Sequence, residues 1–261
     1  MIKLIASDLD GTLLLNGAQR LNPEVFDLIR ALKEHGILFT AASGRQYTNL
    51  RRLFAPVKDD IAYVAENGSL CIYEGKTLSK GMIGRELGLR IIDAVHSYGR
   101  CECIVSGERV CYTDSRDTRF KEHMLHVVGN DMEFVSDLKE DVHEPFLKLA
   151  LCDFQGTRKT EEHFKALFSD EIKIVTSGNI WVDFITPGAN KGNALQVLLD
   201  HLHIDAKDCV AFGDQCNDEE MLQLAGVSYA MADAAPAVIQ QASHTTDSVE
   251  NVLKRILEAL E

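Results

Sequence analysis

The stretch that decides the fold is residues 1–13, MIKLIASDLDGTL. Residues 2–6 form a short, nearly continuous apolar run, which is typical of a strand buried on both faces of a parallel sheet. The run leads directly into DLDGT at 8–12, where a glycine permits a sharp turn and two carboxylates follow the strand. Ligands of open α/β sheets bind outside the carboxyl ends of the strands. The opening of the chain therefore predicts a buried strand with functional side chains at its end.

Strand and helix patterns alternate outward from this stretch. Asn22 is a good N-cap and Pro23 suits the first helical position, so a helix is expected before the next apolar run, at 37–41. A second helix is expected at 45–54 and a third strand at 61–65. This alternation predicts an α/β protein with a Rossmann-like, doubly wound parallel sheet.

The pattern changes in the middle of the chain and then returns. Helices are expected at 85–98, 116–126 and 159–168, a strand at 146–152, and hairpins at 103–113 and 172–184, the second turning at Ser177-Gly178-Asn179. After residue 187, helices at 191–202 and 218–225 alternate with strands at 209–212 and 227–231, and Asp247 with Glu250 predicts a capping-box start to the last helix. We therefore expect an α/β core built from residues 1–81 and 187–261, with an inserted α+β domain at 82–186.

Composition narrows the class of protein. The formal net charge is −13, with 27 basic and 40 acidic residues, whereas nucleic-acid binders usually carry a basic patch or stripe. The seven cysteines are odd in number and contain no CxxC pair, which is typical of reduced thiols. No apolar run approaches a signal peptide or a membrane span. We expect a cytoplasmic monomer or weak homodimer without a nucleic-acid or membrane partner.

Asp8 and Asp10 form the first candidate cluster. They are two apart in an extended segment, so their side chains are expected to face one small volume. Close carboxylates repel unless a cation joins them or one of them holds a proton. An ionised carboxylate can attack phosphorus, and a protonated one can donate to a leaving oxygen. A solvated acidic turn after a strand would give the same residues, and this motif alone does not separate the two interpretations.

Two further clusters lie where helices are expected to begin. Ser43 and Gly44 lead into Arg45, and a helix N-terminus with a hydroxyl beside it can hold an anion. A plain N-cap serine is the simpler interpretation of that motif. Lys191 stands at a helix start, where the helix dipole disfavours a cation. A phosphate and an aspartate nearby would explain it, although a solvated lysine is the commoner case.

The fourth cluster is GDQCND at 213–218. Asp214 and Asp218 are four apart, so they can share one side of a helical turn. Mg²⁺ usually takes one or two carboxylates together with water and substrate phosphate. An acidic helix N-terminus is the alternative interpretation. All four clusters are expected to follow strands of one parallel sheet and to gather at its carboxyl edge, where they would supply the parts that phosphoryl transfer needs.

The sequence resembles the haloacid dehalogenase (HAD) superfamily, and within it the Cof-type phosphatases with a large α/β cap of type IIB. The motifs that carry the resemblance are DLDGTL at 8–13, SGR at 43–45, ENG at 66–68, KG at 191–192, GDQCNDEEML at 213–222 and AMADA at 230–234. The match loosens at Ala232-Asp233, where relatives often carry Gly-Asn. The resemblance implies a Mg²⁺-dependent phosphatase with an aspartyl-phosphate intermediate and a cap that selects the substrate.

The resemblance also implies a role for each catalytic and metal-binding residue. Asp8 would be the nucleophile and a magnesium ligand. Asp10 would be the general acid and then the base, and its backbone carbonyl would bind the metal. Asp214 would ligate the metal, and Asp218 would support it directly or through water. Lys191 would hold the phosphoryl group close to the nucleophile.

The remaining implied roles concern the substrate. Ser43, with Gly44 beside it, and Asn217 would bind the phosphoryl group. Arg45 and the loop at 66–68 would line the entrance to the site. A small phosphorylated metabolite is expected, and sugar phosphates, nucleotides and cofactor phosphates all remain open.

Two other functions are compatible with the same motifs. A sugar phosphomutase would return the phosphate to the substrate rather than to water. A non-enzymatic binder or phospho-switch would keep the nucleophilic aspartate and turn over slowly. Asp10 argues against a switch, because a general acid and base speeds dephosphorylation.

Overall fold

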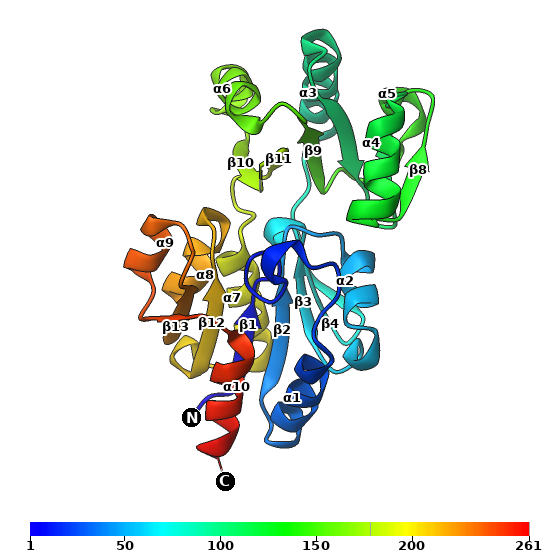
Figure 1. Ribbon diagram of the computed structural model, residues 1–261. Coiled ribbons are helices and arrows are strands. Elements are labelled where there is room, and N and C mark those ends of the chain that lie inside the picture. The colour runs from blue at the N-terminus through cyan, green and yellow to red at the C-terminus, as the bar shows by residue number, and fades with distance from the viewer. Residues whose placement is uncertain (178, 261) are drawn as a thin grey trace. The chain divides into compact units, whose positions relative to one another are not determined.

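The computed structural model describes residues 1–177 and 179–260, which form two compact units (Figure 1). Unit 1 comprises Met1–Ser79 and Asn190–Glu261, and unit 2 comprises Lys80–Ala189. Unit 1 thus ends at residue 79 rather than 81 and resumes at 190 rather than 187. The assignment of catalytic-core and cap roles to these units stays a prediction.

Unit 1 is built on an eight-stranded sheet in the order β14-β13-β12-β1-β2-β3-β4-β5. Its strands are β1 (Leu4–Ser7), β2 (Leu38–Ala42), β3 (Ala62–Ala65), β4 (Leu70–Tyr73), β5 (Lys76–Lys80), β12 (Cys209–Gly213), β13 (Val227–Met231) and β14 (His244–Thr246). Strand β1 lies between β2 and β12 and pairs with both in parallel, so segments from the two ends of the chain are adjacent (Figure 1). All four residues of β1 are buried, as the apolar opening predicts. The pairing of β3 with β4 is antiparallel.

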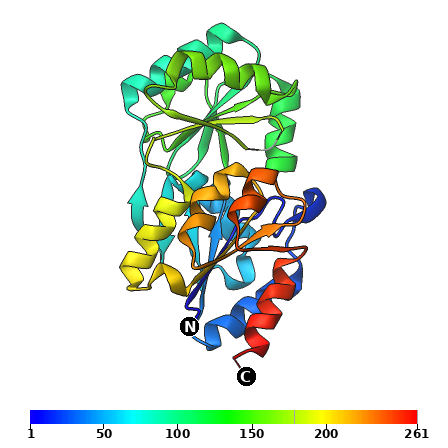
Figure 2. The ribbon, with the colours of Figure 1, turned by 90° about the vertical axis from the view of Figure 1, so that its left-hand side faces the viewer.

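Helices cover both faces of this sheet, which confirms the doubly wound α/β class. They are α1 (Pro23–Glu34), α2 (Tyr47–Leu53), α7 (Lys191–Leu202), α8 (Glu219–Leu224), α9 (Pro236–Gln241) and α10 (Val249–Glu258). Helix α1 packs against α10 on one face and α7 packs against α8 on the other (Figure 2). The Asn22 side chain accepts a hydrogen bond from the Glu24 amide, so the predicted N-cap of α1 is confirmed. Short helical turns are η1 (Leu15–Gly17), η2 (Ala55–Val57), η3 (Glu66–Gly68), η5 (Ala206–Asp208) and η6 (Cys216–Asp218).

Unit 2 has a six-stranded sheet in the order β10-β11-β9-β6-β7-β8. Its elements are α3 (Arg85–Tyr98), β6 (Glu102–Ser106), β7 (Cys111–Thr113), α4 (Thr118–His123), η4 (Met124–Val128), β8 (Met132–Phe134), α5 (Leu138–Asp141), β9 (Lys148–Cys152), α6 (Thr157–Phe168), β10 (Lys173–Ser177) and β11 (Trp181–Ile185). Both predicted hairpins are confirmed, because β6 pairs with β7 and β10 pairs with β11 in antiparallel fashion. Gly178, in the second turn, lies outside the described residues. Apolar side chains of α3 and α6 pack on one face of the sheet and those of α4 and η4 on the other.

Several predicted helix starts differ from the observed ones, among them those of α4, which begins at Thr118 rather than at 116, and of α6, which begins at Thr157 rather than at 159. Helix α2 begins at Tyr47 rather than at Arg45, because Ser43 to Arg45 form a local turn and the N-cap of the helix is Gln46, whose backbone is extended. The last helix is capped by Ser248, whose side chain accepts from the Asn251 amide, and not by Asp247.

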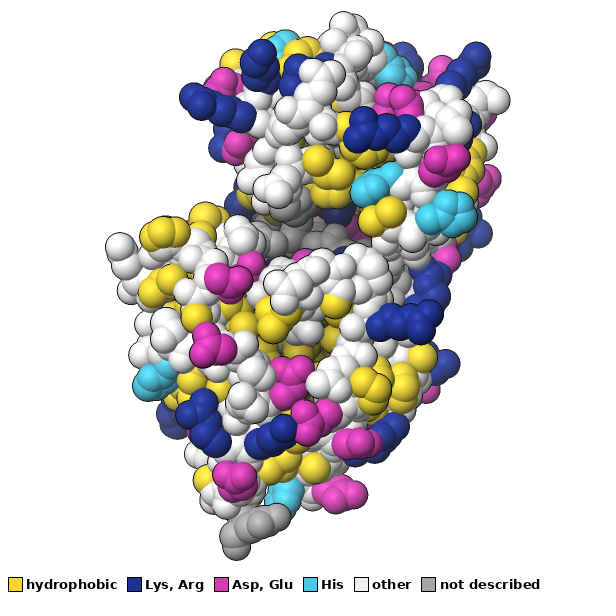
Figure 3. Space-filling model, viewed as in Figure 1, with side chains coloured by type: hydrophobic (Ala, Val, Ile, Leu, Met, Phe, Trp, Pro, Cys, Tyr) yellow, Lys and Arg dark blue, Asp and Glu magenta, His cyan; other side chains and the backbone are white. Residues whose placement is uncertain are grey.

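The surface and the cysteines agree with a charged protein whose thiols are reduced. The seven cysteines stand as thiols rather than in disulfides, and six of them are buried. On the face of unit 1 in Figure 3, acidic and basic side chains are intermixed. Among residues 1–177 and 179–260, no helix combines the length and the apolar character needed to cross a membrane.

Candidate active site

The candidate site begins where β1 and β12 end side by side. The two strands are parallel with Ser7 opposite Phe212, and the Asp8 amide donates to the Phe212 carbonyl at 3.0 Å. Asp8 therefore follows β1 at the same edge of the sheet as Asp214 follows β12, with Asp214 one residue further along in the register. This is the carboxyl edge that the sequence predicts for both residues.

Lys191 joins this edge by a different route from the one predicted. It does not follow a strand of the parallel sheet, because the strand before it, β11, belongs to unit 2. Lys191 is instead the first residue of α7, and its side chain is fully buried. The ammonium donates to Asp8 Oδ1 and to Asp218 Oδ1, both at 2.6 Å. Two carboxylates thus compensate a cation that the helix N-terminus disfavours.

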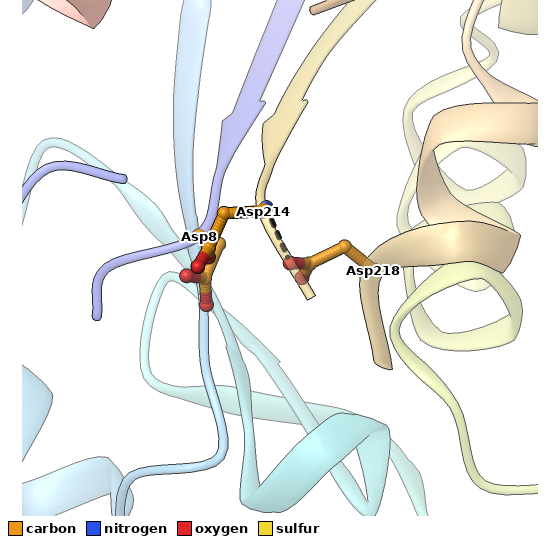
Figure 4. A group of neighbouring side chains, drawn as sticks. All are labelled: Asp8, Asp214 and Asp218. Carbon is orange, nitrogen blue, oxygen red and sulfur yellow. Dashed lines mark hydrogen bonds between the residues drawn. The ribbon is translucent and has the colours of Figure 1, made fainter. Parts of the chain in front are cut away.

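Three carboxylates meet around this lysine. Asp8, Asp214 and Asp218 are buried, and each offers an oxygen within 4.8 Å of the others. Figure 4 shows Asp8 and Asp214 side by side, with Asp218 on the neighbouring turn. Asp218 Oδ2 accepts from the backbone amides of Asp214 and Gln215, both at 3.0 Å. In the described part of the chain, this is the one acidic group that could hold a metal ion.

The pKa shifts of the cluster reflect burial first and the mutual repulsion of the carboxylates second. Burial raises the pKa of the Asp8 carboxyl well above 3.8, Lys191 opposes this, and the charges of Asp218 and Asp214 add to it. Burial also raises the pKa of Asp214. Burial alone would lower the pKa of Lys191, but the two carboxylates raise it. A divalent cation with oxygen ligands fits this cluster, because it would neutralise the excess negative charge.

Asp214 is oriented by two residues that the sequence analysis did not single out. Thr12 Oγ1 donates to its Oδ1 at 3.1 Å, and Gln215 Nε2 donates to its Oδ2 at 2.9 Å. Gly11, with φ +91°, has no side chain, and a Cβ there would lie 2.2 Å from Asp214 Oδ2. Thr12 stands inside the quoted motif, so its hydroxyl was visible. The role of Gln215 depends on how the turn after β12 folds, and no sequence pattern predicts that role.

Asp10 is not part of the carboxylate cluster. Its exposed side chain pairs with Arg45, whose Nε and Nη2 donate to the two carboxylate oxygens at 2.8 and 2.6 Å. Arg45 also donates to Asn49 Oδ1 at 3.3 Å. The structure therefore does not bring the carboxylates of Asp8 and Asp10 into one cluster, because the guanidinium holds the second one. Sequence reasoning missed this pair.

Ser43 and Gly44 lie at the end of β2. Ser43 is buried, and its Oγ accepts from the Arg45 amide at 3.1 Å. The serine therefore caps a local turn and not helix α2. Gly44 leaves room for a neighbouring side chain, since a Cβ there would lie 2.9 Å from Asn67 Oδ1.

Asn217 and the loop at 66–68 complete the site. Asn217 lies in η6, half-buried, and its Nδ2 donates to Asn67 Oδ1 at 3.0 Å. The loop was expected to line an entrance, but all three of its residues are buried. The structure thus brings the predicted residues of unit 1 together in two linked groups, one around Lys191 and one around Asn67.

Comparison with known proteins identifies the family of the chain that carries this site. A family model of haloacid dehalogenase-like hydrolases matches residues 5–256. The chain belongs to this family. A relative in Escherichia coli (strain K12) is the 5-amino-6-(5-phospho-D-ribitylamino)uracil phosphatase YbjI. The HAD-like sequence is 30% identical to it over 263 residues, and the match covers 98% of this chain and 97% of that protein. It is 29% identical to the HMP-PP phosphatase of Enterobacter sp. (strain 638), covering 94% and 89%.

Solved structures agree with the HAD-like assignment. A protein from Streptococcus mutans UA159 is 29% identical, with a TM-score of 0.88 over 99% of this chain and all of that one. A HAD/COF-like hydrolase from Plasmodium vivax gives a TM-score of 0.89 over 99% of this chain and 96% of that one. At 21% sequence identity, this likeness shows only that the two proteins share a fold. The predicted Cof-type membership is confirmed.

Proposed function

We propose that this HAD-like chain is a Mg²⁺-dependent phosphomonoesterase that acts on a small phosphorylated metabolite through an aspartyl-phosphate on Asp8. One observation carries the proposal. A fully buried Lys191 binds Asp8 and Asp218 at 2.6 Å beside a third buried carboxylate, Asp214. This arrangement combines a fixed nucleophile, a phosphate-binding cation and oxygen ligands for a metal at one edge of the sheet.

The relatives support the type of reaction. Both curated relatives described above are named as phosphatases, and the name of the Escherichia coli protein specifies a phosphorylated ribitylaminouracil. We extend only the shared chemistry to this chain. Its substrate is a sugar phosphate or a cofactor or nucleotide phosphate, and it acts on its substrate without nucleic-acid or membrane partners, as a cytoplasmic monomer or weak homodimer.

Asp8 forms the intermediate. Its Oδ1 is held by Lys191, which leaves Oδ2 as the oxygen that attacks phosphorus. The Asp8–phosphorus bond forms while the bond between phosphorus and the ester oxygen of the substrate breaks. A water molecule then attacks the same phosphorus, inorganic phosphate leaves, and the Asp8 carboxylate is restored.

Asp10 moves the proton in both steps. It protonates the departing ester oxygen and afterwards takes a proton from the attacking water. Arg45 holds the carboxylate at both oxygens, so the acid role requires this pair to loosen when the leaving group approaches. The exposure of Asp10 allows such a movement.

Asp8, Asp214 and the backbone carbonyl of Asp10 would hold Mg²⁺, with Asp218 as support. Asp218 is held in place by hydrogen bonds from Lys191 and from two backbone amides, and it would support the metal directly or through water. When bound, Mg²⁺ neutralises charge on the phosphoryl group and on the carboxylates. Thr12 and Gln215 orient Asp214 toward this role.

Ser43, Gly44, Lys191 and Asn217 bind the phosphoryl oxygens. The Ser43 hydroxyl and the Asn217 amide are donors, and Gly44 lets the anion approach the backbone. Arg45 stands beside them with a guanidinium suited to a phosphate or to a polar group of the substrate.

The test is phosphate release from p-nitrophenyl phosphate by the full chain, with and without Mg²⁺. We expect Mg²⁺-dependent release that Asp8→Asn abolishes and that the control variant Asp27→Asn retains, because Asp27 is an exposed residue of α1 that pairs with Arg30. Full activity in Asp8→Asn would remove the proposed nucleophile. Transfer of the phosphoryl group to another position of a hexose phosphate, rather than to water, would favour the phosphomutase instead.

A further inference from the structure

The turn between β3 and β4 has an unusual backbone. Glu66, Asn67 and Gly68 all have left-handed φ values, of 52°, 56° and 91°. Non-glycine residues seldom adopt this conformation, and Asn does so more readily than most. Here Glu66 and Asn67 are 2% and 1% exposed, so the turn is enclosed rather than free at the surface. A buried left-handed turn persists only where its surroundings hold it, and such turns concentrate at functional sites.

The turn is tied to the loop that carries Ser43. The Asn67 amide donates to the Ser43 carbonyl at 3.1 Å, and the Glu66 amide donates to the Arg45 carbonyl at 3.1 Å. The Asn67 side chain lies against Gly44, where a Cβ would be 2.9 Å from its Oδ1. The backbone of the phosphate-binding loop therefore rests on this turn.

The turn also supports the start of α7. A Cβ on Gly68 would lie 2.1 Å from the carbonyl oxygen of Asn190, the residue immediately before Lys191. Only glycine allows this approach, which fixes the backbone from which the buried lysine projects.

The third connection is to the metal-binding loop. Asn217 Nδ2 donates to Asn67 Oδ1 at 3.0 Å. A side-chain amide has two N–H donors and an oxygen acceptor, and its terminal torsion is broad. Without a partner the terminal torsion of the Asn217 side chain would be unrestrained, and its N–H groups would not be fixed in one direction.

We propose that Asn67 is a positioning residue for the hydrolysis. By accepting one N–H of Asn217, it fixes the amide so that the second N–H remains for a phosphoryl oxygen. The backbone amide of Asn67, which donates to the Ser43 carbonyl, also holds Ser43 in position relative to the Asn217 amide. Asn67 acts through these two residues and does not itself touch the reacting atoms. The inference rests on the proposed function, because it assigns phosphoryl binding to Ser43 and Asn217.

The first measurement uses Asn67→Gly, which keeps the left-handed backbone and removes only the side chain. Loss of a residue that orients a ligand-binding side chain typically costs about 10- to 100-fold in activity. We expect a loss of this size in kcat/KM for p-nitrophenyl phosphate, with a matching rise in the inhibition constant of inorganic phosphate. Asn16→Gly is the matched control, because Asn16 is also left-handed, at φ 55°, but exposed. It should retain wild-type values.

The decisive comparison is a cycle of Asn67→Gly, Asn217→Ala and the double variant. If Asn67 acts through Asn217, the double variant should be no worse than Asn217→Ala, both in kcat/KM and in phosphate inhibition. Losses that multiply would overturn the inference, because a merely structural residue lowers activity whatever stands at position 217. Wild-type activity and its loss in Asp8→Asn are read in the same assay. An inactive wild type, or an active Asp8→Asn, would reject the proposed function. If the wild type is active, Asp8→Asn is inactive and the losses of the two Asn variants multiply, only the role of Asn67 is rejected.

Discussion

Replacing Lys191 with methionine tests the charge balance of the site directly. The variant keeps the approximate volume of the side chain and removes only the ammonium. In the wild type this group is fully buried and binds Asp8 Oδ1 and Asp218 Oδ1. Without it, three buried carboxylates remain, each with an oxygen within 4.8 Å of the others.

The size of the effect follows from burial and from the proton that Asp8 can bind. Removing one partner of a buried ion pair costs about 3–5 kcal/mol of stability. The pKa of Asp8 is already raised by burial and would rise further without Lys191, so the carboxyl can take up a proton and relieve part of the repulsion. We therefore expect a loss near the lower end, about 3 kcal/mol at neutral pH. A carboxyl whose pKa is raised on folding costs stability as the pH rises through that pKa, because the folded protein must then hold the charged form. The stability lost in Lys191→Met should therefore be larger at alkaline than at acidic pH.

The assay is urea unfolding followed by far-ultraviolet circular dichroism, in chelator and then in Mg²⁺. Lys207→Met is the matched control, since Lys207 is exposed and pairs with Asp205 at the surface, and it should change stability little. Mg²⁺ should stabilise Lys191→Met more than it stabilises the wild type, because the metal replaces the missing charge. A Lys191→Met variant as stable as Lys207→Met in chelator would refute the reasoning, and so would an equal effect of Mg²⁺ on variant and wild type.

Three further outcomes are expected. Chelation should abolish phosphate release and lower the Tm, and added Mg²⁺ should restore both; a chelated protein with full activity would exclude the metal. Burial works to raise the pKa of Asp153, but hydrogen bonds such as that from Thr160 hold it below 3.8. Its stabilising contribution is therefore present above that value and lost in stronger acid, so Tm should fall more steeply below about pH 4 in the wild type than in Asp153→Asn, and parallel curves would contradict this. Gly68→Ala places a Cβ 2.1 Å from the Asn190 carbonyl oxygen and should destabilise the chain by about 1–3 kcal/mol, clearly more than Gly75→Ala, where φ is also positive, at 72°, but the space is open.

Much of the fold is predictable because the buried apolar side chains of a helix or a strand recur at a regular spacing in the sequence. The bounds of α3, α7 and β13 match the predicted ones, and the first two are amphipathic helices with buried apolar faces. The strands that were missed, β5, β8 and β14, are short or exposed. Their partners in the sheet hold them in place, and no apolar alternation marks them. Ser248 was missed as a cap because Asp247 and Glu250 offer the same chemistry one residue away.

The candidate site is predictable where a motif follows a strand. Asp8 and Asp214 were expected together because β1 and β12 end at one edge, and they lie there. The helix that starts at Lys191 and its closeness to Asp8 were expected, but its entry after a strand of unit 2 and the pairing of Arg45 with Asp10 were not. Both arise from tertiary packing between segments far apart in sequence, which no local pattern records.

The most direct test of the account is to locate the covalent phosphate. The full chain would be mixed with Mg²⁺ and p-nitrophenyl phosphate, quenched in acid during turnover, digested and analysed by mass spectrometry. Asp10→Asn serves as a second sample, because slower hydrolysis should let the intermediate accumulate. The account predicts a phosphate adduct on the peptide that contains Asp8, absent from Asp8→Asn. An adduct on a different residue would contradict it, as would steady turnover without any adduct in either sample.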